Sequence, residues 1–290
     1  MWINDKKGYL QDWITQQWVK ATGKRILSFE QHWLYAPHGD TKAIANHFVE
    51  RLSNKQNLSV IHNKPGFGLI ENIDEWQLSK EEKQRLHPEV IAFYENTFDY
   101  HFEVWSHWCG AFQPFGWLLS ILFSKRLQQL NLPLNPLDPA KGIESNIIKL
   151  VDAEANTVKF TIWYRKLKAT NHVIYSGVYG TAEVPNFTGK CLKVSFPLPN
   201  GSATVIMRIT VLEDGSLLLS SNGKSFGDSG FYFTLTNHEG KYWARFVKSM
   251  HENIRVYIDE EKQLRADHVL YFYGLRFLHL HYKMTKKGIL

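Results

Sequence analysis

The chain has 290 residues, of which 44% are hydrophobic and 21% are charged. This composition can fill a large core in one domain or in two, and it excludes intrinsic disorder. The net charge is +6, but lysines and arginines are spread along the chain among acidic residues, so we expect no nucleic-acid partner.

Two features bear on where the protein resides. Cys109 and Cys191 lie far apart in dissimilar contexts, which predicts reduced thiols, and the first residues form no apolar run of the signal-peptide kind, so we expect a cytoplasmic protein. The most apolar stretch, 108–123, is shorter than the roughly 20 residues of a membrane helix and contains Gln113 and Pro114. It predicts a buried helix and no membrane span, with weak contact to a membrane surface as the alternative.

The sequence begins with helical periodicity. Apolar residues recur at helical spacing over 10–21 and are followed by Gly23, a residue type that commonly ends helices. A second helix is expected over 44–52, where the apolar positions again share one face. The segments 58–62 and 66–70, separated by turn residues, predict a short hairpin.

Helical signals continue to residue 130. Ser79 with Glu82 matches a capping box, and Pro88 is well placed in the first turn of a helix whose apolar register continues to residue 105. A further apolar helix is expected over 115–130. The next segment, 131–142, contains three prolines and cannot continue a helix, so we expect a helical region at 1–131 and a β-rich domain at 143–290.

After this boundary the apolar period changes from 3.6 to 2, beginning with the alternation over 158–165. Asp214 and Gly215 mark a tight hairpin turn between two of the expected strands. Further strands are expected at 173–179, 190–196, 203–212, 216–220, 230–236, 242–248, 254–258, 268–273 and 276–284. The predicted fold class is α+β, with a helical N-terminal half followed by an antiparallel β-barrel or a strongly curved sheet.

Several segments of the sequence, taken together, resemble uncharacterised bacterial proteins classed as domains of unknown function. These segments are HPEVIAFYENT, LPLNPLDP, SFPLPNG, FGDSGFY, IRVYIDEEKQLRADH and LHLHYKM. The resemblance covers roughly residues 85–284 and implies no established activity. The number of strands is also similar to that of lipocalin and fatty-acid-binding barrels, and this likeness of architecture implies a cavity for an apolar ligand.

Two sets of residues could carry chemistry. His279 and His281 lie two apart on an expected strand and share a face, as metal ligands on one strand would, although hydrogen-bonded structural histidines are the preferred interpretation. Glu252 shares a face with aliphatic residues of its strand, so it is expected to point inward. There it would bind a ligand, act as a base, or form a structural ion pair with an arginine, the candidates being Arg245, Arg265 and Arg276.

The first functional hypothesis is therefore a binding protein for a small apolar or amphipathic molecule, with Arg165, Arg208, Glu252 and His279 as polar anchors. The second is a hydrolase or isomerase that uses Glu252 or the pair His279 and His281 as base, with or without a metal. The third is a non-catalytic interaction domain with a solid core. The sequence indicates no particular cofactor, ligand or oligomeric state.

Overall fold

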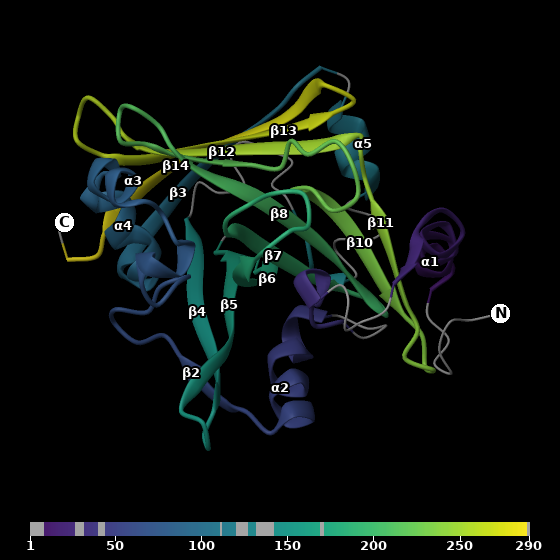
Figure 1. Cartoon of the computed structure of the whole chain (residues 1–290). Helices are drawn as coiled ribbons and strands as arrows, with labels where there is room; N and C mark the ends of the chain where they lie inside the picture. Colours follow the sequence, from purple (N-terminus) through teal and green to yellow (C-terminus); the bar gives the residue numbers. More distant parts are fainter. Residues whose placement is uncertain are drawn as a thin grey trace.

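The computed structural model describes residues 9–26, 32–39, 44–110, 112–119, 127–131, 142–168 and 171–288, and one antiparallel sheet dominates it (Figure 1). Its strands are β1 (Lys24–Ile26), β2 (Ser59–His62), β3 (Tyr100–Trp108), β4 (Ile143–Asp152), β5 (Thr157–Leu167), β6 (Val173–Ala182), β7 (Cys191–Leu198), β8 (Gly201–Val211), β9 (Leu217–Ser220), β10 (Gly230–Thr236), β11 (Tyr242–Phe246), β12 (Met250–Ile258), β13 (Leu264–Phe272) and β14 (Leu275–Lys286). The helices are α1 (Leu10–Thr22), α2 (Ile44–Gln56), α3 (Lys80–Arg85), α4 (Pro88–Glu95) and α5 (Phe112–Leu119), with 3-10 turns η1 (His32–Leu34), η2 (Ile73–Trp76) and η3 (Thr97–Asp99).

Several local predictions are confirmed. Helix α1 ends before Gly23, whose backbone N–H donates to the Val19 carbonyl oxygen at 2.8 Å. The capping box at the start of α3 is present, since the Ser79 hydroxyl accepts from the Glu82 backbone N–H and the Glu82 carboxylate accepts from the Ser79 backbone N–H. Pro88 opens α4. Every strand expected from residue 158 onward is also present.

The N-terminal half is not helical as a whole, and this corrects the predicted fold class. Helix α4 ends at Glu95, and the residues expected to continue it form strand β3, in which Tyr100, Phe102 and Val104 are buried while the residues between them are exposed. The apolar positions of this segment fit a period of 2 as well as a helical period. Pairing of β3 with β14 along its whole length selects the strand.

The hairpin expected over 58–70 is also wrong. Strand β2 pairs with β4, and the segment after it makes turns instead of a second strand. The backbone N–H groups of Leu69 and Ile70 donate to the Tyr94 carbonyl oxygen at the end of α4. Gly68 permits this approach, because a Cβ atom there would lie 2.2 Å from the same oxygen. The two apolar residues that resembled a strand instead anchor a loop to a helix end.

The sheet is open, so the expected β-barrel is wrong. The strand order is β2-β4-β5-β6-β7-β8-β9-β12-β13-β14-β3, and within the described part of the chain the end strands β2 and β3 do not pair with each other. The sheet also forks at β8, which pairs with β10 through residues 201–206 and with β9 through residues 208–211. Strands β11 and β1 extend the first branch, and Figure 1 shows the two branches diverging beyond β8.

Helices from the first region cover both faces of the strands around β5. Helix α2 packs Phe48 against one face, in a cluster with Ile162, while α4 packs Phe93 against the other face, near Trp163. Strands β2 and β3 of the same region pair with β4 and β14. The division into domains 1–131 and 143–290 stays a prediction, and residues 132–141 lie outside the described part.

Candidate functional site

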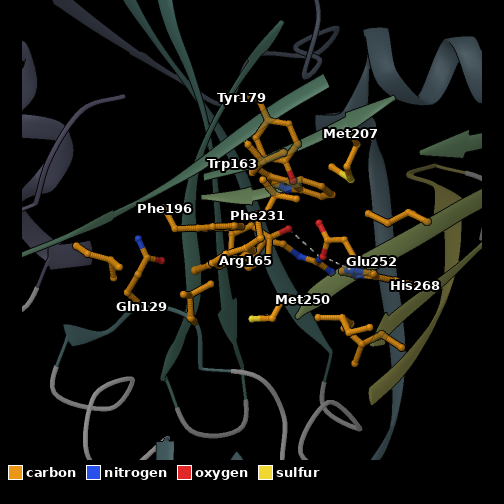
Figure 2. A pocket seen from close by; sticks show the side chains of 18 of the residues that line it. Gln129, Trp163, Arg165, Tyr179, Phe196, Met207, Phe231, Met250, Glu252 and His268 are labelled. Atoms are coloured by element: carbon orange, nitrogen blue, oxygen red, sulfur yellow. Dashed lines mark hydrogen bonds and ion pairs between the residues drawn. The ribbon is translucent and has the colours of Figure 1, made fainter. Parts of the chain in front are cut away.

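One face of the sheet lines a cavity of about 550 Å³ (Figure 2). Side chains of β3, β5–β10 and β12–β14 form its wall, together with side chains of α1, α4 and α5. The lining is almost entirely apolar, and its members include Leu69, Phe93, Phe102, Trp163, Leu192, Val194, Phe196, Val205, Met207, Leu219, Phe231, Ile254, Val256, Ala266, Leu270 and Leu280. This volume lies within the range of roughly 300–1,000 Å³ that is usual for small-molecule sites.

Arg165 is the only lysine or arginine among the described residues that line this cavity. It lies on β5, is only 3% exposed, and its guanidinium carbon lies 4.8 Å from the centroid of the Trp163 ring and 4.9 Å from that of the Phe102 ring. The rings of Tyr175 and Tyr282 lie at 5.6 Å and 5.1 Å. These four rings offer their negative faces to the cation, which offsets part of the cost of removing it from water.

The hydrogen bonding of Arg165 is incomplete. Its Nη1 group donates to the Tyr175 hydroxyl at 3.2 Å. Its Nε and Nη2 groups are fully buried and have no hydrogen-bond partner among the described residues. Arginine stays protonated in proteins, so this guanidinium keeps a full charge, and two of its nitrogens are buried without a hydrogen-bond partner among the described residues.

Glu252 and His268 form the second polar group of the lining. Glu252 Oε2 lies 2.8 Å from His268 Nε2, and both side chains are mostly buried. The backbone N–H of Glu252 donates to the Ser221 hydroxyl at 2.8 Å, which holds this part of β12 against the end of β9. Among the described residues the bonded partner of Glu252 is thus a histidine, not one of the three arginines considered from sequence.

Tyr282 lies close to both polar groups. The pKa of its hydroxyl is raised to about 12. Burial is the main cause and the charge of Glu252 adds to it, while the charge of Arg165 and a hydrogen bond with Arg165 lower the pKa. Since both charges act on one hydroxyl, Arg165 and Glu252 belong to the same end of the cavity, and Figure 2 shows their side chains directed toward one another. Burial also raises the pKa values of Tyr94 and Tyr179, so these two side chains remain protonated hydroxyls at neutral pH.

The structure places two of the four expected anchors, Arg165 and Glu252, in this cavity, and two outside it. Arg208 lies over the Phe187 ring, with 4.7 Å between its guanidinium carbon and the ring centroid, and is not part of the lining. His279 is also outside the lining, because it lies on the opposite face of β14 from Leu280 and Tyr282.

His279 and His281 share a partner on that outer face. His279 Nε2 lies 3.1 Å and His281 Nδ1 lies 2.7 Å from the same oxygen of Asp267. Among the residues that the structure describes, no group of three or more histidine, cysteine or acidic side chains has the geometry to hold a metal ion. The two histidines are therefore hydrogen-bonded to one shared carboxylate.

His268 and Tyr175 were not among the four expected anchors. On β13, His268 is opposite Ile254, so Glu252 is its diagonal neighbour across the pair of strands. Such a diagonal contact follows from the register, and the sequence does not fix the register of β12 and β13. Tyr175 reaches Arg165 because the two residues are paired across β5 and β6.

Comparison with known proteins gives one informative match. No family model matches the chain. No solved structure matches it. Over 235 residues, or 79% of its length, the chain is 25% identical to a Bacillus subtilis (strain 168) protein named "Uncharacterized membrane protein YndJ", and it spans 40% of the length of that relative. Similarity to an uncharacterised bacterial protein is thus confirmed.

The same match corrects the expected location. The relative is named a membrane protein, which contradicts the expectation of a cytoplasmic protein. Within the described residues, none of the helices combines the length and the apolarity that crossing a membrane requires.

Proposed function

We propose that the protein binds a small apolar or amphipathic molecule in the cavity on the inner face of its sheet. The observation that carries this proposal is the cavity itself, about 550 Å³ in volume and walled by aliphatic and aromatic side chains. Transfer of an apolar ligand from water into such a space is favourable in proportion to the apolar area that is buried. The few polar side chains of the lining would fix the orientation of the ligand.

The polar anchors of this proposal are Arg165 and Glu252. Both line the cavity, and two buried nitrogens of Arg165 have no hydrogen-bond partner among the described residues. Arg208 and His279 lie away from the lining and are no longer part of the proposal. The role resembles that of lipocalin barrels, which hold apolar ligands inside a closed sheet, but here the face of an open, forked sheet and the helices that cover it surround the space.

The test fills the cavity and measures binding of a hydrophobic dye. Ala266 lines the cavity on β13, so Ala266→Phe places a ring in the space that a ligand would use. We expect this variant to reduce dye affinity about tenfold or more, because the added ring displaces ligand volume. The matched control is Val269→Phe, which adds a ring to the same strand outside the lining.

The control should bind the dye as the wild type does. Equal dye affinity of both variants and the wild type would show that the dye does not enter this cavity. Native mass spectrometry of protein purified from cells complements the test, because a retained lipid-like mass in the wild type should be absent from Ala266→Phe.

A second candidate function is hydrolysis or isomerisation with Glu252 as general base. The observation that favours it is the contact of 2.8 Å between Glu252 and His268 inside the cavity, since a carboxylate and an imidazole in contact can transfer a proton to or from a bound substrate. Glu252→Gln should then lower turnover of a chromogenic ester by a factor of about 100 or more. Unchanged turnover in this variant would rule out the role, and His279→Ala, outside the lining, serves as its control.

A further inference from the structure

The charged side chains of the cavity do not all form ion pairs with one another. Within the described lining, Arg165 is the only lysine or arginine, whereas two carboxylates are present, Glu252 in contact with His268 and Asp12 on α1. Arg165 has no carboxylate within ion-pair distance among the described residues; its Nη1 group donates to the Tyr175 hydroxyl, and hydrogen bonding from Arg165 also lowers the pKa of the Tyr282 hydroxyl. A cation in an apolar space without an anionic partner is costly, and the surrounding rings offset only part of that cost.

The positions of the donor nitrogens without a partner indicate which chemical group could bind Arg165. The Tyr175 hydroxyl accepts a hydrogen bond from Nη1. The two nitrogens without a hydrogen-bond partner among the described residues are Nε and Nη2. These two nitrogens form one edge of the guanidinium plane, and their N–H groups are parallel. That edge is the fork that receives the two oxygens of a carboxylate in a bidentate pair.

We propose that the ligand of the cavity is an apolar monocarboxylic acid, whose carboxylate binds the Nε and Nη2 edge of Arg165 while its hydrocarbon part fills the cavity. This inference rests on the proposed function and specifies the ligand class. The rings of Phe102, Trp163, Tyr175 and Tyr282 hold the guanidinium in place, so little side-chain freedom is lost when the acid binds.

A monoanion fits the cavity better than a phosphate monoester. One free edge of one guanidinium offers two donors, whereas a phosphate carries a charge of about −1.5 to −2 and three acceptor oxygens. The carboxylate of Glu252 acts on the same end of the cavity, and its repulsion grows with the charge of the ligand headgroup. A carboxylate saturates the edge and adds one negative charge only.

The decisive experiment compares three probes with the same chain, namely dodecanoate, dodecanol and dodecyl phosphate, by calorimetric titration of the full wild-type chain. We expect dodecanoate to bind about 10-fold to 100-fold more tightly than dodecanol, because hydrogen bonds to a charged group favour the acid. Dodecyl phosphate should bind more weakly than dodecanoate. Equal affinity for the acid and the alcohol overturns the inference while leaving the proposed function in place.

Two further outcomes are distinguishable. Tighter binding of dodecyl phosphate than of dodecanoate overturns the carboxylate assignment. Failure of all three probes to bind overturns the proposed function, and the inference with it. These comparisons use the wild type alone, so they decide the question even where a substitution of Arg165 does not fold.

Substitutions of Arg165 test whether this side chain causes the preference for the acid over the alcohol. Arg165→Met should retain dodecanol binding and lose the preference for the acid, whereas Arg165→Lys, which keeps the charge without the fork, should retain only part of that preference. Arg208→Met is the matched control, since it removes a ring-stacked arginine outside the lining and should leave the preference unchanged. An undiminished preference in a folded Arg165→Met protein overturns the assignment.

Discussion

Strands β12–β14 carry a titratable cluster on each face of the sheet, and the two clusters differ in what surrounds them. On the inner face, Glu252 and His268 contact each other within an apolar cavity. On the outer face, Asp267 accepts hydrogen bonds from His279 and His281 while about a third of each side chain remains exposed. The inner contact is therefore shielded from water, whereas solvent weakens the outer contacts.

In a sheet, residues that are adjacent in the sequence can lie in different environments. Asp267 and His268 are adjacent in the chain, yet they point to opposite faces and join different clusters. The spacing of His279 and His281 fits a pair of metal ligands, but both residues belong to the outer cluster. The cavity pair combines residues of two strands and has no local sequence pattern.

The largest expected difference between the faces is in core stability. Leu280→Ala on the inner face should lower the free energy of unfolding by about 2–4 kcal/mol, because Leu280 is buried in an apolar cluster. His279→Ala, on the next residue but the outer face, should lower it by less than about 1 kcal/mol. Urea unfolding of both variants measures the difference. Similar losses in the two variants would mean that the outer face is also a core surface.

A smaller effect, and one that depends on pH, is expected at Asp267. Burial raises the pKa of its carboxyl group, but hydrogen bonds from His281, Tyr257 and His279 outweigh burial and hold the pKa below its ordinary value. A depressed pKa in the folded state contributes stability above the unfolded pKa of about 3.9, and this stability is lost as the pH falls through the folded value.

Asp267→Asn should therefore lower the free energy of unfolding by about 1 kcal/mol at pH 7. The gap to the wild type should shrink as the pH falls below about 4 and nearly close where the wild-type carboxyl is also protonated. Urea unfolding at pH 7 and at pH 3 measures both values. A gap that stays constant with pH would show that the carboxylate charge does not matter to this cluster.

The smallest effect is expected from metal. Because Asp267, His279 and His281 satisfy one another and no described neighbour completes a coordination shell, a small excess of Zn²⁺ should leave the melting temperature within about 1 °C of its starting value. Differential scanning calorimetry checks this. A larger rise that disappears in the double variant His279→Ala/His281→Ala would restore the outer cluster as a metal site.

Periodicity and turn chemistry predicted local elements well. Alternation located the strands from β5 to β14, and the capping box and Pro88 located the starts of α3 and α4. These features are encoded within a few residues, so they can be read from the sequence alone. The inward direction of Glu252 followed from the same alternation.

Long-range pairing could not be predicted in the same way. The segment of β3 fits helical and strand periods alike, and only its partner β14, far along the chain, decides between them. The open edge and the fork at β8 likewise depend on which strands meet. In the site, the contact of Glu252 with His268 and of Arg165 with Tyr175 follows from strand register, which the sequence leaves undetermined.

The pairing of β3 with β14 has a consequence for the order in which the protein is made. Strand β3 ends at Trp108, but its partner begins only at Leu275, so at roughly 5–20 residues per second the ribosome needs roughly 10–30 s to supply that partner. During this time a strand with alternating apolar side chains has neither edge paired with another described strand, and an unpaired edge is a template for aggregation. Nascent chains released before β14 should therefore depend on chaperones for solubility, and slow folding is expected for a topology with so distant a final contact.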